Sequence, residues 1–143
     1  MSRAAGGFLL VRAGGRRVGL ALSHVVEVTQ VGAVHPVPSV EPAVRGVVAV
    51  HGRLVPVVHL GALLEAVPCP PMIGSLMVVV TLDGRKICLE IDDAEVVVRE
   101  PALPVPHGST LPWALGVARH QEGLVPLLDL DALSSRFTEV SSA

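Results

Sequence analysis

Aromatic and cysteine side chains are scarce in this sequence. Its 143 residues include one tryptophan, two phenylalanines and no tyrosine. Pockets for small organic ligands are usually lined by apolar and aromatic side chains, so this composition argues against a ligand-binding barrel or an enzyme subunit. The two cysteines, Cys69 and Cys88, have neither CxxC spacing nor the density of a disulfide scaffold. We expect both to be structural, with Cys88 acting as a small buried hydrophobe.

The sequence also lacks an excess of one charge and a long apolar run. Eleven basic residues against thirteen acidic ones give a net charge of -2, which argues against nucleic acid or an anionic membrane surface as a partner. The densest apolar run, 76–82, is far shorter than the roughly 18 residues that cross a bilayer. The apolar stretch at 8–11 is too short for the core of a signal peptide. We therefore expect a soluble, cytoplasmic protein that is not inserted in a membrane.

Valine is abundant, and glycine and proline are spaced through the whole chain. Valine is stiff at χ1 and suits the pleated surface of a sheet, so this composition favours β structure. A helical pattern occurs only over 60–65 and 130–137. Short apolar runs between turn residues predict about ten strands, over residues 8–11, 18–22, 25–31, 47–50, 54–60, 76–82, 87–91, 96–98, 114–118 and 124–128.

Turn residues separate these runs. Gly14-Gly15 and Asp83-Gly84 predict tight hairpins, because both pairs tolerate positive φ, and His51-Gly52 and Glu122-Gly123 look similar. The proline-rich segments 34–42 and 101–112 are predicted to be loops, since proline lacks the N–H that a strand ladder needs. For the same reason, Pro56 and Pro126, each inside a predicted strand, require an edge position or a bulge.

Two parts of the chain resemble each other. Residues 15–22 (GRRVGLAL) align with 84–91 (GRKICLEI) at an offset of 69. Residues 53–60 (RLVPVVHL) align with 123–130 (GLVPLLDL) at an offset of 70. The chain therefore contains two similar units.

We interpret residues 1–143 as a single domain with repeat units at approximately 8–64 and 76–133, a proline-rich connection at 67–71 and a polar C-terminal tail at 134–143. Five short strands per unit predict a mainly β fold of two pseudo-repeated, five-stranded, SH3-like barrels packed together, with one or two short helices. A terminal strand could cross between units, so the pattern leaves open which strands complete which barrel. A groove between the units would suit an extended or helical partner.

Several motifs carry a family resemblance. They are 8–11 (FLLV), 15–22 running into 25–28 (VVEV), the block 44–60 (VRGVVAVHGRLVPVVHL), and in the second half 89–92 (LEID), 115–117 (LGV) and 123–130. The central block follows a pattern of RGV, NLRG, hydrophobic-Pro-hydrophobic and DL. Over roughly residues 8–133, the sequence resembles CheW-like domains, the coupling modules of bacterial chemotaxis.

The resemblance implies a non-enzymatic adaptor without a cofactor. Such proteins bridge the cytoplasmic tips of methyl-accepting chemoreceptors to the regulatory domain of a CheA-like histidine kinase, and are recruited to receptor arrays at the membrane. Partner recognition of this kind needs apolar contacts with a few charges and no catalytic group. Carried over by position, the partner-binding surface would include Val25, Glu27, Val28, Arg45, Gly46, His51 and Gly52.

Three positions depart from the family pattern. Ala49 and His51 stand where the NLRG turn has asparagine and arginine, and His59 stands where an aspartate is usual. Histidine is shorter than arginine and mostly neutral near pH 7, so one partner contact could be weakened or rewired. A divergent adaptor that binds only the receptor or only the kinase is therefore an alternative. A small β-barrel ligand-binding protein is another.

Other candidate chemistry is weak. His51 and His59 lie at the ends of one hairpin arm, but no cysteine or carboxylate clusters beside them, so we predict no metal site. No serine stands in a G-x-S-x-G motif, and no phosphate-binding glycine loop occurs. The carboxylates of Asp92, Asp93 and Glu95 fit either a solvated turn or a charged rim for a partner. Two further pairs of interpretations stay open: Glu27 as an exposed edge residue or a partner contact, and Trp113 as a barrel plug or an interface anchor.

Overall fold

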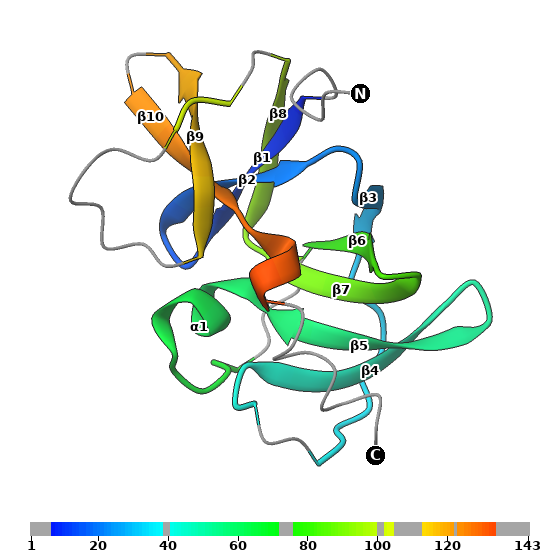
Figure 1. The fold of residues 1–143 in the computed structure, drawn as a ribbon. Helices are drawn as coiled ribbons and strands as arrows, with labels where there is room; N and C mark the ends of the chain where they lie inside the picture. Colours follow the sequence, from blue (N-terminus) through cyan, green and yellow to red (C-terminus); the bar gives the residue numbers. More distant parts are fainter. Residues whose placement is uncertain are drawn as a thin grey trace.

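The computed structural model describes residues 7–38, 41–71, 76–99, 102–104, 113–121 and 123–133. Figure 1 shows two groups of strands, one above the other, with short helical segments beside and between them. The strands are β1 (Phe8–Ala13), β2 (Arg16–Ala21), β3 (Val25–Gln30), β4 (Val44–Val50), β5 (Arg53–His59), β6 (Leu76–Leu82), β7 (Arg85–Ile91), β8 (Asp93–Val98), β9 (Ala114–His120) and β10 (Gly123–Leu128). Helix α1 (Leu60–Glu65) follows β5, and a helical turn over 130–133 follows β10. The predicted mainly β fold with two short helices is confirmed.

The hairpin turns follow the predicted chemistry, with one shift. Gly14-Gly15, His51-Gly52 and Asp83-Gly84 all have positive φ at both residues, as a two-residue hairpin turn requires. The prediction of a turn at Glu122-Gly123 is wrong by one residue. Gly123 pairs with His120 as the first residue of β10, so the turn begins at Gln121, which has a φ of 55°. The expected loop at 101–112, His107 included, lies mostly outside the described residues, as does the tail 134–143.

The strands form two five-stranded sheets that exchange hairpins. Their orders are β8-β1-β2-β10-β9, called sheet A below, and β3-β6-β7-β5-β4, called sheet B. The β1–β2 hairpin thus lies among strands from the second half of the chain, and the β6–β7 hairpin lies among strands from the first half. Strands that align at an offset of about 70 residues hold equivalent places in the two orders. Neither aligned half of the sequence builds a sheet alone.

The exchanged hairpins lie where the two sheets meet. Side chains alternate along β6, so Val78 and Val80 join the large core shared by both sheets, whereas Met77 and Val79 join a smaller cluster belonging to sheet B. β1 behaves in the same way, with Leu9 and Val11 in the shared core. Burial on both faces explains why these strands read as nearly continuous apolar runs.

In the described part of the chain, an isolated backbone bridge links the segment after one edge strand of each sheet to the other edge strand. After β3, His35 pairs with Val47 of β4, and after β8, Leu103 pairs with Val117 of β9. The crossing backbone passes so close that a Cβ on Gly46 would lie 2.3 Å from the His35 carbonyl oxygen, and one on Gly116 would lie 2.7 Å from that of Leu103. The two glycines, aligned in the repeat, therefore allow the edges of each sheet to approach.

Of the two positions expected for Pro56 and Pro126, an edge strand is wrong, because β5 and β10 are internal in the sheet orders. The pairing of β10 with β9 does shift register just after Pro126, between Leu127 and Leu128. Pro56 pairs with Val47 of β4, but the parallel pairing of β5 with β7 begins only at Val57. Pro126 likewise precedes Leu127, where β10 pairs with β2. Each proline thus lies where its strand is paired on one side only, so the missing N–H leaves no gap in a ladder.

Candidate functional site

The residues predicted to bind partners all lie on three elements of sheet B. Val25, Glu27 and Val28 are on β3, one edge of the sheet, and Arg45 and Gly46 are on β4, the other edge. His51 and Gly52 form the turn between β4 and β5. The structure brings Glu27 and His51 together, whereas Arg45 is bound to a different carboxylate. Because the sheet curls, one surface contains residues from both of its edges.

β3 presents an exposed apolar face. Its register with β6 shifts between Val25 and Glu27, which is a bulge, and Val25 and Glu27 are half-buried. Val26 and Val28 are 46% and 41% exposed. Exposed and half-buried side chains alternate along β3, so Val26 and Val28 lie on the same face. The family resemblance named Val28 but not Val26.

Glu27 and His51 form a close contact across the edges of sheet B. The imidazole Nε2 of His51 lies 2.6 Å from Oε2 of Glu27, with side-chain exposures of 71% and 33%. His51 has a φ of 47°, a left-handed conformation that histidine adopts more readily than most residues, and Gly52 follows with 81°. The turn therefore aims the imidazole at β3.

Arg45 is engaged inside the fold. Its Nε donates to Oε1 of Glu90 on β7 at 2.6 Å, and a second guanidinium nitrogen donates to Oε2 at 3.3 Å. The side chains are only 12% and 3% exposed. Since β5 lies between β4 and β7 in the sheet, this ion pair spans a strand and fixes the start of β4. Sequence reasoning did not single out Glu90, which looks like one polar residue in an apolar strand.

His59, which stands where the family pattern has an aspartate, caps helix α1. Its Nδ1 accepts a hydrogen bond from the backbone N–H of Ala62 at 3.0 Å and caps the N-terminus of α1. At the corresponding place in the second half, Oδ1 of Asp129 accepts from the N–H of Ala132 at 3.0 Å. An unprotonated imidazole nitrogen and a carboxylate oxygen are both acceptors, so the departure at His59 preserves the cap.

The carboxylates after β7 are mostly used within the protein. Asp92 accepts a hydrogen bond from the backbone N–H of Gly14 at 2.9 Å. Glu95 forms ion pairs with Arg12 and Arg17, both at 3.0 Å. These contacts hold the β1–β2 hairpin against β8. Asp92 and Glu95 therefore have a structural role.

Trp113 and Cys88 are buried in the interior, and Cys69 is half-buried. Trp113 packs in the shared core, where the guanidinium of Arg16 lies 5.8 Å from its ring centre. Cys88 is fully buried in the cluster inside sheet B. Burial, together with the nearby negative charge of Glu27, raises the pKa of the Cys88 thiol to about 12. Burial also raises the pKa of Cys69, whose thiol donates to the Ala43 carbonyl at 3.0 Å.

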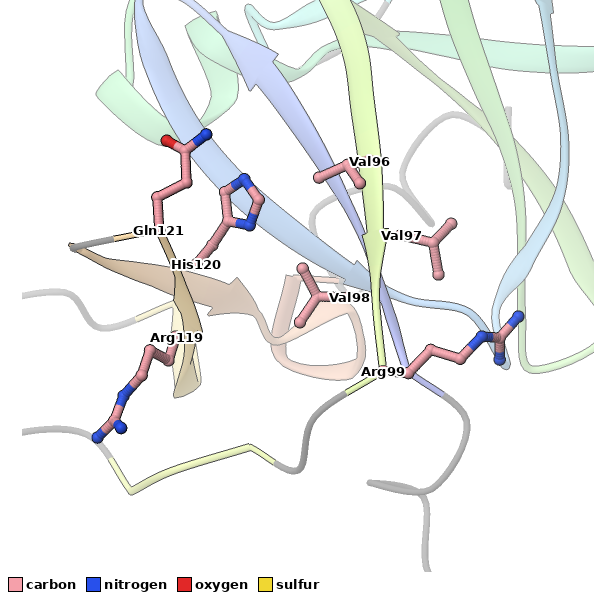
Figure 2. A pocket seen from close by; sticks show the side chains of 7 residues that line it. All are labelled: Val96, Val97, Val98, Arg99, Arg119, His120 and Gln121. Carbon is pink, nitrogen blue, oxygen red and sulfur yellow. The ribbon is translucent and has the colours of Figure 1, made fainter.

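A small pocket lies in sheet A, between β8 and the turn from β9 to β10. It has a volume of about 320 Å³ and is lined by Val96, Val97, Val98, Arg99, Arg119, His120 and Gln121. Figure 2 shows Val96 and Val98 on the side of β8 that faces His120 and Gln121, whereas the guanidinium groups of Arg99 and Arg119 point away from each other. The two cations do not converge on a single ligand.

The described residues form neither a metal site nor a membrane-spanning helix. Within 7–38, 41–71, 76–99, 102–104, 113–121 and 123–133, no three His, Cys, Asp or Glu side chains gather where they could hold a metal ion. The helices in these same ranges are all too short or too polar to cross a membrane.

Comparisons with known proteins agree with the architecture. The model of the family described as "CheW-like domain" matches residues 7–138. Among curated proteins no significant match is found. Among solved structures, the fold is similar to that of the scaffolding protein TtCheW from Thermoanaerobacter tengcongensis, with a TM-score of 0.75 and 18% identity, covering 87% of this chain and 88% of that one. The chain belongs to the CheW-like domain family, a family of non-enzymatic chemotaxis scaffold proteins.

Proposed function

We propose that this protein is a cytoplasmic adaptor that couples the tips of chemoreceptors to the regulatory domain of a CheA-type histidine kinase. Its action is binding, and the protein is recruited to receptor arrays through its partners. Family membership supports a scaffold role. The main structural support for the proposal is the surface made by the edge strand β3 and the turn from β4 to β5.

The chemistry of this surface suits a protein partner. β3 pairs with β6 on one side, so along most of its length the other side offers unpaired backbone groups to an incoming chain. The exposed Val26 and Val28 supply apolar contact. Beside them, the Glu27–His51 pair supplies polar groups that can fix the register of a partner.

The other predicted residues act behind this surface. Arg45 holds β4 to β7 through Glu90, and Gly46 lets the chain after β3 cross β4. We propose that both residues affect partner binding by positioning β3 relative to the turn. Gly52 completes the turn that aims His51 at Glu27.

The proposal is tested by placing a charge on the apolar face of β3. Val28→Asp introduces a carboxylate at a 41% exposed position of one edge strand, and Val96→Asp does the same at a 39% exposed position of the other edge strand, β8. Val96 is the matched control because β8 holds the equivalent place in sheet A. Both proteins are titrated with the isolated kinase regulatory domain and with a receptor tip fragment.

Val28→Asp is expected to weaken binding of at least one partner by about tenfold or more, which is the loss of a well-placed interface residue. Val96→Asp is expected to bind at least one partner more tightly than Val28→Asp does. Loss of binding to one partner alone would assign the β3 surface to that partner. Equal affinities in Val28→Asp and the wild type for both partners would exclude β3 from the interface.

A further inference from the structure

The two sheets have the same strand arrangement, but they differ in a side-chain contact between an edge strand and a hairpin turn. In sheet B the contact lies between β3 and the turn from β4 to β5, and in sheet A the corresponding place lies between β8 and the turn from β9 to β10. The first residue of the turn is His51 in sheet B and Gln121 in sheet A, and both have a positive φ. The two turns thus carry different side chains at the same position.

Among the described residues of sheet A, which leave out Glu122, no ion pair is found across the corresponding space. Val96 holds the place in β8 that Glu27 holds in β3, because Glu27 pairs with Val79 of β6 and Val96 pairs with Leu10, the equivalent residue of β1. The neighbouring Glu95 is turned toward Arg12 and Arg17 of the adjacent hairpin. Gln121 carries no charge with which to attract it. The space is the pocket of about 320 Å³ shown in Figure 2.

In sheet B the space is spanned by His51 and Glu27. Their 2.6 Å contact joins the tip of the β4–β5 hairpin to the far edge of the same sheet. A carboxylate ordinarily stays ionised above about pH 5, whereas histidine is the side chain whose charge ordinarily changes between about pH 5 and pH 8. The contact is therefore an ion pair when the imidazole is protonated and a weaker, neutral hydrogen bond when it is not.

We propose that the His51–Glu27 contact is a proton-dependent latch, which holds the β4–β5 hairpin against β3 when His51 is charged and releases it when His51 is neutral. The open form of sheet B would resemble the pocket seen in sheet A. The biological role of the latch rests on the proposed function, because β3 and this hairpin form the proposed partner surface.

The surroundings of the latch contain few competing charges. β3 carries no other ionisable side chain, and β6, against which it packs, carries none. On β5, the exposed Arg53 follows the turn. On β7, Cys88 senses the charge of Glu27 but is a neutral thiol at these pH values. On β4, Arg45 is paired with Glu90 of β7.

The β6–β7 hairpin also brings two cations to sheet B, at Arg85 and Lys86. The carboxylate of Glu27 is the charged group in direct contact with the imidazole, at 2.6 Å.

The latch is tested in the isolated protein by amide hydrogen exchange, read by NMR as protection factors at about pH 5.5 and about pH 8. Amides of β3 and of the β4–β5 hairpin are expected to be about two- to fivefold better protected at the lower pH, the range of an exposed ion pair. Amides of the β1–β2 hairpin, which contains no histidine or carboxylate, are the internal control in the same sample and are expected to show no such change.

Two variants separate the latch from other effects of pH. His51→Gln places at this position the residue that the equivalent turn of sheet A carries. Its protection factors are expected to be low at both pH values, so the pH dependence is lost. His51→Arg carries a permanent positive charge, so its protection factors are expected to be high at both pH values. An unchanged pH dependence in His51→Gln, or none in the wild type, would overturn the proposal.

Partner binding is measured separately. Titration of the kinase domain and the receptor tip at both pH values shows whether the latch affects affinity. If neither partner binds, the proposed function fails, but the exchange data still decide whether the latch exists.

Discussion

Arg45 of β4 and Glu90 of β7 form a buried ion pair that passes across the intervening strand β5, with Nε and Oε1 separated by 2.6 Å. In the described part of the chain, Glu90 is the one charged residue that is fully buried. Leaving one of two buried charges without its partner costs far more than an exposed pair contributes.

Arg45→Met is therefore expected to lower the free energy of unfolding by about 3 kcal/mol, as measured by urea denaturation. Glu90→Gln should cost a similar amount, and the double variant should cost less than the sum of the two. Arg53→Met, at an exposed position, is the control and should change stability by less than about 0.5 kcal/mol. Additive losses would contradict the pairing.

Gly46 and Gly116 are expected to tolerate substitution less well than the turn glycine Gly52. A Cβ would lie 2.3 Å and 2.7 Å from a backbone carbonyl oxygen at the first two positions, and backbone cannot move aside cheaply. Gly46→Ala and Gly116→Ala should each destabilise the protein by more than about 2 kcal/mol, measured by thermal unfolding. Gly52→Ala meets no atom within 4 Å and should cost about 1 kcal/mol through its positive φ alone. Equal losses at all three positions would show that the crossing backbone is not the cause.

The cap on α1 gives a test of the departure at His59. His59→Ala removes the acceptor for the Ala62 N–H and should lower stability by about 1 kcal/mol. His59→Asp restores the family residue and an acceptor oxygen, so it should be at least as stable as the wild type. Asp129→Ala should show a loss similar to that of His59→Ala, because it caps the equivalent helical turn. A stable His59→Ala variant would assign the histidine some other role.

Alkaline pH should destabilise the protein through Cys88. Its pKa is raised from 9.0 to about 12 in the folded protein, so above about pH 9 the unfolded chain loses a proton that the folded chain keeps. The contribution is fully present below pH 9 and is lost as the pH rises toward 12, with a slope of up to about 1.4 kcal/mol per pH unit. Urea denaturation between about pH 8 and pH 10 measures this slope. Cys88→Ala should flatten it, and the same slope in that variant would rule out this thiol as the cause.

Much of the fold was predictable from local patterns. Apolar runs located the strands, and the residues of three hairpin turns matched the positive φ that such turns need. The exchange of hairpins between sheets was not predictable, because β1 and β6 are apolar on both faces and so carry no sign of which sheet they join. Pairing partners far apart in sequence are decided by packing of the whole molecule.

The candidate site was only partly predictable. The family resemblance named Glu27 and His51 separately, but their contact depends on the curling of sheet B. It also named Arg45, whose guanidinium is bound by Glu90, a residue that stands in the sequence as one polar side chain in an apolar strand. Both ion pairs arise from tertiary structure and leave no periodic signal in the sequence. Val26 is different: it lies on the same exposed face of β3 as Val28, as strand alternation requires, but the resemblance did not name it.

The central claim is that this protein joins two partners. The most direct measurement is a pair of titrations of the purified wild-type chain, one with the kinase regulatory domain and one with a receptor tip fragment from the same cell, followed by a test for a complex of all three. The account predicts saturable binding to each partner and a ternary complex. Binding to neither partner would contradict it.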